Sequence, residues 1–182
     1  EIPLQRGRKA MSLDYVLNAR SVAIVGASKN ETKRGYQAIK TLLEQEFDGK
    51  IYPVNPKEDS ILGFKCYPKV SDIEEPVDLA LITTPAKTVP SIIEDCGKKG
   101  VKGAVIIAGG FRELGAEGKR LEQEMLEVAR KYNVRLIGPN TSGMMNLKNN
   151  LNLVGKVVKD EEAINQKHQG LGESQRVRLR SG

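Results

Sequence analysis

Short apolar runs alternate along the chain with segments in which apolar residues recur every three or four positions. Five runs are rich in β-branched residues and predict strands, at residues 21–25, 51–54, 78–83, 103–107 and 134–137. Three segments between them have helical spacing, with apolar residues at Tyr36, Ile39, Leu42, Leu43 and Phe47, at Val89, Ile92, Ile93 and Cys96, and at Leu121, Met125, Val128, Ala129 and Tyr132. Strands and helices therefore alternate over this part of the chain.

Strands that are apolar on both faces are typical of a parallel sheet, because each crossover connection lays a helix on one face. The pattern therefore predicts an α/β fold with a doubly wound, Rossmann-like parallel sheet of about five main strands. Two helices are expected to end in left-handed residues, at Gly100 and at Asn133. Ligands of such sheets bind beyond the carboxyl ends of the strands, which directs attention to the loops 26–34, 55–59, 84–87, 108–114 and 138–146.

The chain divides into one folded section and two flanking sections. Its 182 residues suffice for a single domain with a buried core, which we place at residues 12–155. Residues 1–11 predict a flexible extension, after which Ser12 is expected to cap a short helix through Asn18. Residues 156–182 contain six basic and four acidic residues without sustained periodicity, and they predict a tail that lacks packed structure of its own.

The net charge of +6 does not indicate a nucleic-acid partner. The chain has no Trp and only three Phe, and the section expected to fold has no basic run with interleaved aromatic residues. No segment approaches the roughly 20 apolar residues that span a bilayer. The first residues also lack the basic start and apolar block of a secretory signal. We therefore expect neither a nucleic acid nor a membrane as a partner.

The two cysteines are too few for a disulfide framework and favour a reducing, cytoplasmic location. Cys96 is expected on the apolar face of its helix, and Cys66 in a surface segment before Tyr67. The sole histidine, His168, has no neighbouring residues that would form a metal site with it. The sequence predicts no catalytic residue, because its paired carboxylates are expected on solvated faces, at Glu44 and Glu46, Glu74 and Glu75, and Glu122 and Glu124.

The loop after the first strand has the residue types of a phosphate site. It places Gly26, Ala27 and Ser28, followed by Lys33 and Arg34, between a strand and the N-terminus of a helix. Free backbone N–H groups and the positive helix end favour an anion there. The alternative is that the glycine only ends the strand and that both cations are solvated. The Gly-x-Gly-x-x-Gly pattern of nicotinamide-binding folds is absent.

The loop after the second strand carries a cation, in Asn55, Pro56 and Lys57. A site that recognises the ribose of NAD expects an acidic residue about 20 residues beyond the glycines. A lysine there instead indicates a nucleotide with an additional phosphate, which fits the 3′-phosphate of CoA or NADP. The alternative is an exposed lysine in a turn.

Three further loops complete the candidate site. The third strand ends in two threonines and a proline, which face the crevice or cap the next helix. The fourth ends in two glycines, past which a pantetheine arm can run close to the main chain, unless this is a plain turn. The fifth ends in a polar segment that forms the last wall of a pocket or a rigid turn. The candidate residues are Thr84, Pro85, Gly109, Gly110, Pro139 and Asn140.

Five stretches, in this order, resemble the CoA-binding domain of NDP-forming acyl-CoA synthetases, which is similar to the N-terminal part of the succinyl-CoA synthetase α subunit. They are residues 22–28, residues 49–57, residues 77–82 with Pro85 and Ala86, residues 103–107 and residues 137–140. The resemblance covers about residues 12–150. It implies a chain that holds CoA, or acyl-CoA, while other modules transfer phosphoryl and acyl groups.

The resemblance also implies roles for the loops. Residues 26–28 would hold the CoA phosphates with help from Lys33 or Arg34, residues 55–57 would contact the adenosine end, and residues 84–85 and 109–110 would border the pantetheine. The family's phosphohistidine and ATP-grasp modules have no match in this sequence, so they are expected on another chain or missing from this one. The alternatives are an NADP-dependent oxidoreductase domain and a stand-alone CoA-sensing or scaffold protein.

Overall fold

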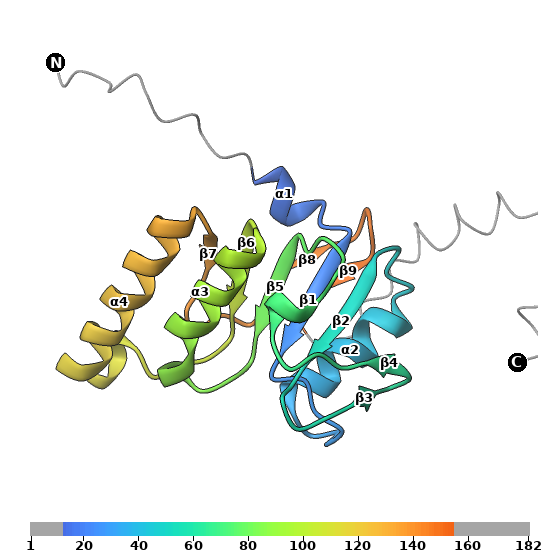
Figure 1. The fold of residues 1–182 in the computed structure, drawn as a ribbon, viewed down its shortest axis with the longest axis horizontal. Coiled ribbons are helices and arrows are strands. Elements are labelled where there is room, and N and C mark those ends of the chain that lie inside the picture. The colour runs from blue at the N-terminus through green and yellow to red at the C-terminus, as the bar shows by residue number, and fades with distance from the viewer. Residues whose placement is uncertain (1–12, 155–182) are drawn as a thin grey trace, which may run out of the picture.

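A computed structural model describes residues 13–154, and a five-stranded parallel sheet forms its centre (Figure 1). The strand order is β2–β1–β5–β6–β7, and every neighbouring pair is parallel. These strands are β1 (Ser21–Val25), β2 (Lys50–Val54), β5 (Leu79–Ile82), β6 (Gly103–Ile106) and β7 (Arg135–Ile137). Their bounds differ from the predicted ones by at most one residue, and the predicted doubly wound α/β fold is confirmed.

Alternate residues of each strand point to opposite sides of the sheet, and they are apolar on both. Helices therefore cover both faces. Ala23 and Val25 pack in the core beneath two helices, whereas Val22 and Ile24 pack in a second core beneath another. All four side chains are buried. The first core lies under α3 (Val89–Lys99) and α4 (Ala116–Tyr132), and the second under α2 (Arg34–Glu44), with the single-turn helix α1 (Asp14–Leu17) beside it.

The predicted helix ends are also confirmed. Gly100 ends α3 with φ +87°, and Asn133 ends α4 with φ +54°, both in the left-handed region that closes a helix. The predicted cap of the first helix, Ser12, lies outside the described residues, as do His168 and the section 156–182. None of the helices within residues 13–154 is both long and apolar enough to cross a membrane.

Two small hairpins that the sequence pattern did not predict lie beside the sheet. One pairs β3 (Ser60–Ile61) with β4 (Phe64–Lys65), and the other pairs β8 (Met145–Asn146) with β9 (Leu151–Asn152). Each strand has two residues, too few for periodicity to identify it. Three 3₁₀ turns were likewise not predicted, at Val70–Asp72, Ala86–Thr88 and Arg112–Leu114.

Two expectations about exposure were wrong. Cys66 is buried, because the β3–β4 hairpin folds back and the Cys66 amide donates to the Asp59 carbonyl at 2.8 Å. Glu122 is also buried, because the side chain of Arg112, from a preceding turn, covers this part of α4. Arg112 Nε donates a hydrogen bond to Glu122 Oε1 at 2.9 Å. This contact lowers the pKa of the Glu122 carboxyl. Cys96 is fully buried as predicted, and burial raises the pKa of its thiol to about 12.

The outer strand β2 is shielded by the segment that follows β4. The carbonyl of Pro53, within β2, accepts a hydrogen bond from the Tyr67 amide at 2.9 Å, and the Asn55 amide donates to the Tyr67 carbonyl at 2.9 Å. Tyr67 thereby forms a one-residue bridge beside the strand. The ring of Tyr67 also packs edge-on against that of Tyr52.

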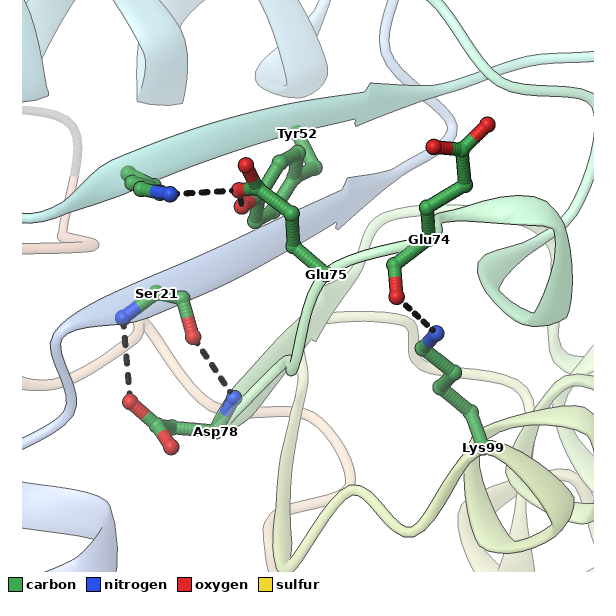
Figure 2. A network of polar contacts seen from close by, with 7 residues as sticks. Ser21, Tyr52, Glu74, Glu75, Asp78 and Lys99 are labelled. Atoms are coloured by element: carbon green, nitrogen blue, oxygen red, sulfur yellow. Dashed lines mark hydrogen bonds and ion pairs between the residues drawn. The ribbon is translucent and has the colours of Figure 1, made fainter.

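The edge at which the strands begin, here the amino edge, is held by paired polar groups (Figure 2). Asp78, just before β5, accepts hydrogen bonds through Oδ2 from the amides of Arg20, at 2.8 Å, and Ser21, at 3.1 Å. In return, the Asp78 amide donates to the Ser21 hydroxyl at 2.9 Å. This exchange joins the starts of two central strands.

A second set of contacts fixes the segment before Asp78. Glu75 accepts from the Lys50 ammonium at 2.6 Å and from the Tyr52 hydroxyl, which lowers the pKa of its carboxyl. Burial, with this carboxylate beside it, raises the pKa of Tyr52. Lys99, at the end of α3, donates to the carbonyls of Ile73 and Glu74. Figure 2 shows Tyr52 of β2 and Lys99 of α3 converging on the loop that carries Glu74 and Glu75.

Candidate functional site

The strand order changes direction between β1 and β5, and the loops that follow these two strands meet there. The chain passes from β1 to β2 on one side, and the later strands of this sheet, β5, β6 and β7, lie on the other. The Thr83 amide donates to the Val25 carbonyl at 2.9 Å. The Thr83 hydroxyl donates to the carbonyls of Val25, at 3.0 Å, and Gly26, at 3.2 Å. Open α/β sheets bind their ligands at such a switch point.

Gly26 is required by this close approach. Its φ is +87°, and a Cβ built on it would lie 2.6 Å from Thr83 Oγ1 and 2.9 Å from Thr84 Cγ2. The amides of Gly26 and Ala27 both donate to the Val54 carbonyl, at 3.0 and 3.3 Å. These two amides therefore fix the loop to β2, and the amides left for an anion are those of the first turn of α2, which lack partners within the helix.

The N-terminus of α2 packs directly on this loop. A Cβ on Gly35 would lie 2.3 Å from the Gly26 carbonyl oxygen and 2.7 Å from Ala27 Cα. Ser28 keeps its hydroxyl proton available, since its Oγ accepts from the Asn30 amide at 3.1 Å. Lys33 is exposed, and its ammonium has no hydrogen-bond or ion-pair partner among the described residues.

Arg34 behaves differently from its neighbour Lys33. It is half-buried, and its guanidinium donates from Nη1 to the Val154 carbonyl at 2.9 Å and from Nη2 to the Ser142 carbonyl at 3.0 Å. The sequence analysis grouped both cations as helpers of a phosphate. In the part of the chain that the structure describes, only the Arg34 side chain of these two is hydrogen-bonded to the protein's own backbone.

The loop after β2 combines a structural residue with a free cation. Asn55 donates from Nδ2 to the Ala27 carbonyl at 2.7 Å and accepts through Oδ1 from the Lys57 amide at 2.9 Å. These contacts hold Pro56 and Lys57 exposed beside the first loop. Nearby, Lys29 pairs with Glu58 at 2.7 Å, and that contact raises the pKa of Lys29. Within residues 13–154, the Lys57 ammonium has no such partner.

A groove of about 340 Å³ lies below these loops, on the side of the sheet that α3 covers. Its apolar wall includes Val25 and Val54, the last residues of β1 and β2, together with Ile92 of α3. Polar side chains line its margin, at Lys69, Ser91, Glu94, Asp95 and Lys98. Asp95 is held there by the amides of Val70 and Ser71, at 2.9 and 3.2 Å. The groove suits a flat, largely apolar ring with polar edges.

The loop after β5 leaves Thr84 beside Gly26. Thr84 is half-buried, and its Oγ1 accepts from the Thr88 hydroxyl at 2.9 Å. The Pro85 carbonyl accepts from the same hydroxyl at 2.8 Å. The alternative role of these residues as a cap is not observed, because no side chain caps the 3₁₀ turn or α3.

The loops after β6 and β7 adjoin each other and form a second group. They reach the first group, the loops after β1, β2 and β5, through Ala86. A Cβ on Gly110, where φ is +104°, would lie 3.2 Å from Ala86 Cβ. A Cβ on Gly109 would lie 3.4 Å from Asn140 Oδ1, and the Asn140 amide donates to the Ala108 carbonyl at 3.0 Å. Pro139 follows a cis peptide bond in the same loop. The structure therefore brings all five predicted loops to the carboxyl edge of the sheet, in two groups that touch.

One charged residue of this edge was missed by the sequence analysis. Glu113 accepts from the Gly110 amide at 2.6 Å, which lowers the pKa of its carboxyl. The only signal in the sequence is an acidic residue three positions after a glycine, a spacing too common to be specific. Because Glu113 uses this amide, the glycine turn offers a ligand its open surface rather than the Gly110 N–H.

Residues 20–146 match the family model described as CoA binding domain, and the chain belongs to this family. The chain is 54% identical over 140 residues to the ADP-forming acetate–CoA ligase of Methanocaldococcus jannaschii, covering 77% of this chain and 19% of that protein. It is 50% identical over 140 residues to the α subunit of ADP-forming acetate–CoA ligase II of Pyrococcus furiosus, covering 77% and 30%.

A solved structure has the same fold. Acetyl-coenzyme A synthetase 1 of Ca. Korarchaeum cryptofilum, in complex with phosphate and ADP, aligns with a TM-score of 0.76 and 44% identity, covering 79% of this chain and 31% of that one. The chain thus spans about a fifth to a third of the length of these relatives. The family match confirms the CoA-binding domain that the sequence resemblance indicated for this chain.

Proposed function

We propose that this chain is the CoA-binding module of an ADP-forming acyl-CoA synthetase, and that the carboxyl edge described above is its CoA site. The observation that carries the proposal is the switch point between β1 and β5, where a glycine loop, a helix N-terminus and a free cation meet in a chain of this family. The identity to ADP-forming acetate–CoA ligases supports the reaction class.

The diphosphate of CoA is assigned to the first loop. Gly26 lets a ligand approach the backbone closely, and Ala27 is buried behind it. The Ser28 hydroxyl can donate a hydrogen bond, and the first-turn amides of α2 present positive dipoles. Lys33 supplies the charge, since its ammonium is exposed at the same helix end. Hydrogen bonds with Val54, Asn55 and Thr83 hold this loop in place.

The adenosine end is assigned to the loop after β2 and to the groove beneath it. The groove offers the apolar walls and polar margin that an adenine ring needs. Asn55 and Pro56 form the turn above it, and Lys57 supplies a cation for the 3′-phosphate. Recognition of this phosphate distinguishes CoA from NAD, which has none.

The pantetheine arm is assigned to the remaining loops. From the switch point it passes Thr84 and Pro85, then the open surface of Gly109 and Gly110, and reaches Pro139 and Asn140 at the end of β7. These loops touch one another, so they offer one continuous path along the edge. The thiol would then leave the domain at the side of β6 and β7.

The calorimetric titration of the 182-residue chain with CoA, dephospho-CoA, NADP and NAD tests this assignment. We expect saturable binding of CoA, weaker binding of dephospho-CoA, and much weaker binding of NADP and NAD. NADP binding equal to or tighter than CoA binding would favour the oxidoreductase alternative and refute the proposal.

We further propose that phosphoryl and acyl transfer occur in phosphohistidine and ATP-grasp modules that this sequence does not contain. The chain should therefore bind CoA without turnover. Incubation with acetyl-CoA, ADP, phosphate and Mg²⁺, followed by assays of free thiol and ATP, should give no product. Turnover by the chain alone that is abolished in His168→Ala would contradict this division of labour.

A further inference from the structure

Arg34 connects two parts of the molecule that are more than one hundred residues apart in the sequence. Its backbone begins α2, directly after the phosphate loop, and its side chain reaches the Asn-rich hairpin, which we define as residues 142–154. The two carbonyls that it contacts, Ser142 and Val154, lie at the two ends of this hairpin. The guanidinium therefore holds together the two ends of the hairpin, here called the hairpin mouth, because one of its nitrogens donates to each carbonyl.

The Asn-rich hairpin runs along α2 from its N-terminus to its C-terminus. At the far end of the helix, Asn150 donates to the Glu46 carbonyl at 3.2 Å and Asn152 to Gln45 Oε1 at 3.4 Å. Asn146 donates to the carbonyl of Leu17 at the end of α1, at 2.8 Å. The hairpin also buries apolar side chains in the second core, at Met144, Leu151 and Leu153. It therefore packs as part of the domain along its whole length.

Both ends of the Arg34 connection are closely packed. On the loop side, no Cβ fits at Gly35 against the Gly26 carbonyl, so the first turn of α2 cannot shift without moving the loop. On the hairpin side, a Cβ at Gly143 would lie 2.3 Å from the Leu153 carbonyl oxygen, so the two strands of the mouth are equally tight. This close packing supplies a physical route by which a displacement at one end would move the other.

We propose that Arg34 is a positioning residue that couples occupation of the phosphate loop to the conformation of the hairpin mouth. The inference rests on the proposed function, since the ligand at the loop is the diphosphate of CoA. Arg34 acts on the backbone of its own chain, and Lys33 beside it supplies the charge that faces the ligand.

The chemistry of the guanidinium explains why arginine suits this position. Its planar group presents several N–H donors in a fixed arrangement, so two separate carbonyls can be held at once. A lysine ammonium, on a flexible stem, would not hold both carbonyls in one fixed geometry. Charge-assisted hydrogen bonds of this kind are also about twice as strong as neutral ones.

Hydrogen exchange provides a direct readout. The Leu153 amide donates to the Met144 carbonyl on the opposite side of the hairpin at 2.9 Å, so its exchange rate reports whether the mouth is closed. The full chain and the variants Arg34→Met, Arg34→Lys and Lys33→Met would be compared with and without saturating CoA. Lys33→Met is the matched control, because it removes the same charge from the neighbouring position.

In the free protein, Arg34→Met should speed exchange at Leu153 by about tenfold, Arg34→Lys by less, and Lys33→Met not at all. CoA should slow this exchange in the unaltered chain and in Lys33→Met, which binds CoA more weakly, but not in Arg34→Met. Exchange unchanged in free Arg34→Met, with CoA affinity reduced, would overturn the proposal and make Arg34 a direct phosphate ligand. CoA binding without any effect on the hairpin would also overturn it, whereas no binding of CoA would refute the proposed function instead.

Discussion

The two edges of the sheet use polar residues in opposite ways. At the amino edge, Asp78 and Ser21 exchange hydrogen bonds, and Glu75 holds Lys50 and Tyr52. At the carboxyl edge, the side chains of Asn55 and Thr83 bind backbone groups of the loops, and the ammonium groups of Lys33 and Lys57 have no partner among the described residues. The amino edge is built for stability. The carboxyl edge keeps its loops in place and leaves these two lysines available.

The largest effect on stability is expected at Asp78. Asp78→Ala removes two charge-assisted hydrogen bonds and leaves the amides of Arg20 and Ser21 without their acceptor. The free energy of unfolding should fall by about 3 kcal/mol, measured by urea denaturation. The affinity of the remaining folded protein for CoA should not change. A parallel loss of CoA affinity would show that the two edges are not independent.

The opposite pattern is expected at Lys57. Lys57→Glu replaces a cation by an anion where the 3′-phosphate is assigned, so CoA affinity should fall about tenfold or more, corresponding to about 1.5 to 3 kcal/mol. The urea midpoint should stay unchanged because the side chain is exposed. Dephospho-CoA is the control ligand, and an equal loss of its affinity would mean that Lys57 does not contact the 3′-phosphate.

A smaller effect, with a defined pH dependence, is expected at Glu75. Its pKa in the folded protein is lowered from 4.5 by the hydrogen bonds from Lys50 and Tyr52. Its carboxylate therefore stabilises the fold above pH 4.5, and this contribution is lost as the pH falls through the lowered pKa. The melting temperature of Glu75→Gln should be lower than that of the unaltered chain at pH 7, and the two melting temperatures should become equal in acid. A difference that persists at low pH would exclude ionisation as its cause.

The smallest effect is expected at the C-terminus of α2, where the helix reaches the amino edge. Glu46 adopts φ +53°, and its amide and that of Phe47 close the helix onto the carbonyls of Leu43 and Leu42. Glu46→Gly should raise the free energy of unfolding by about 0.5 to 1 kcal/mol, because glycine adopts this conformation without strain. Gln45→Gly, where φ is −89°, should destabilise instead. CoA binding should be unaffected in both variants.

The sequence was sufficient for features that depend on local pattern. The strands follow from short apolar runs, and Gly100 and Asn133 were identified as helix ends because few residues tolerate a left-handed conformation. The resemblance to a known family then placed five loops at one edge, and the structure does bring them together. Their contacts with CoA remain predictions.

Features that depend on distant contacts were not predictable in this way. Arg34 resembles Lys33 in sequence, and only its contacts 108 and 120 residues away separate the two. The burial of Glu122 depends on how the turn carrying Arg112 folds over α4. Cys66 is buried by a hairpin whose strands are too short to show a periodicity. The Arg34 partners lie far outside any window in which a periodic pattern is visible. The burial of Glu122 and Cys66 depends instead on the path of a turn and of a short hairpin, which periodicity does not describe.

The shielding of β2 bears on how the protein behaves at high concentration. Within a strand, the N and O of one residue point to the same side, so the outer side of Pro53 offers no N–H, and its carbonyl is already bonded to Tyr67. Exposed sheet edges recruit strands from other molecules through such unpaired groups, and edge-to-edge polymerisation begins there. At the outer side of β2, Pro53 has no N–H to offer and Tyr67 occupies its carbonyl, so an approaching strand finds no unpaired group at this residue. Replacement of Pro53 by a residue with a backbone N–H would restore a donor on the side from which another chain approaches.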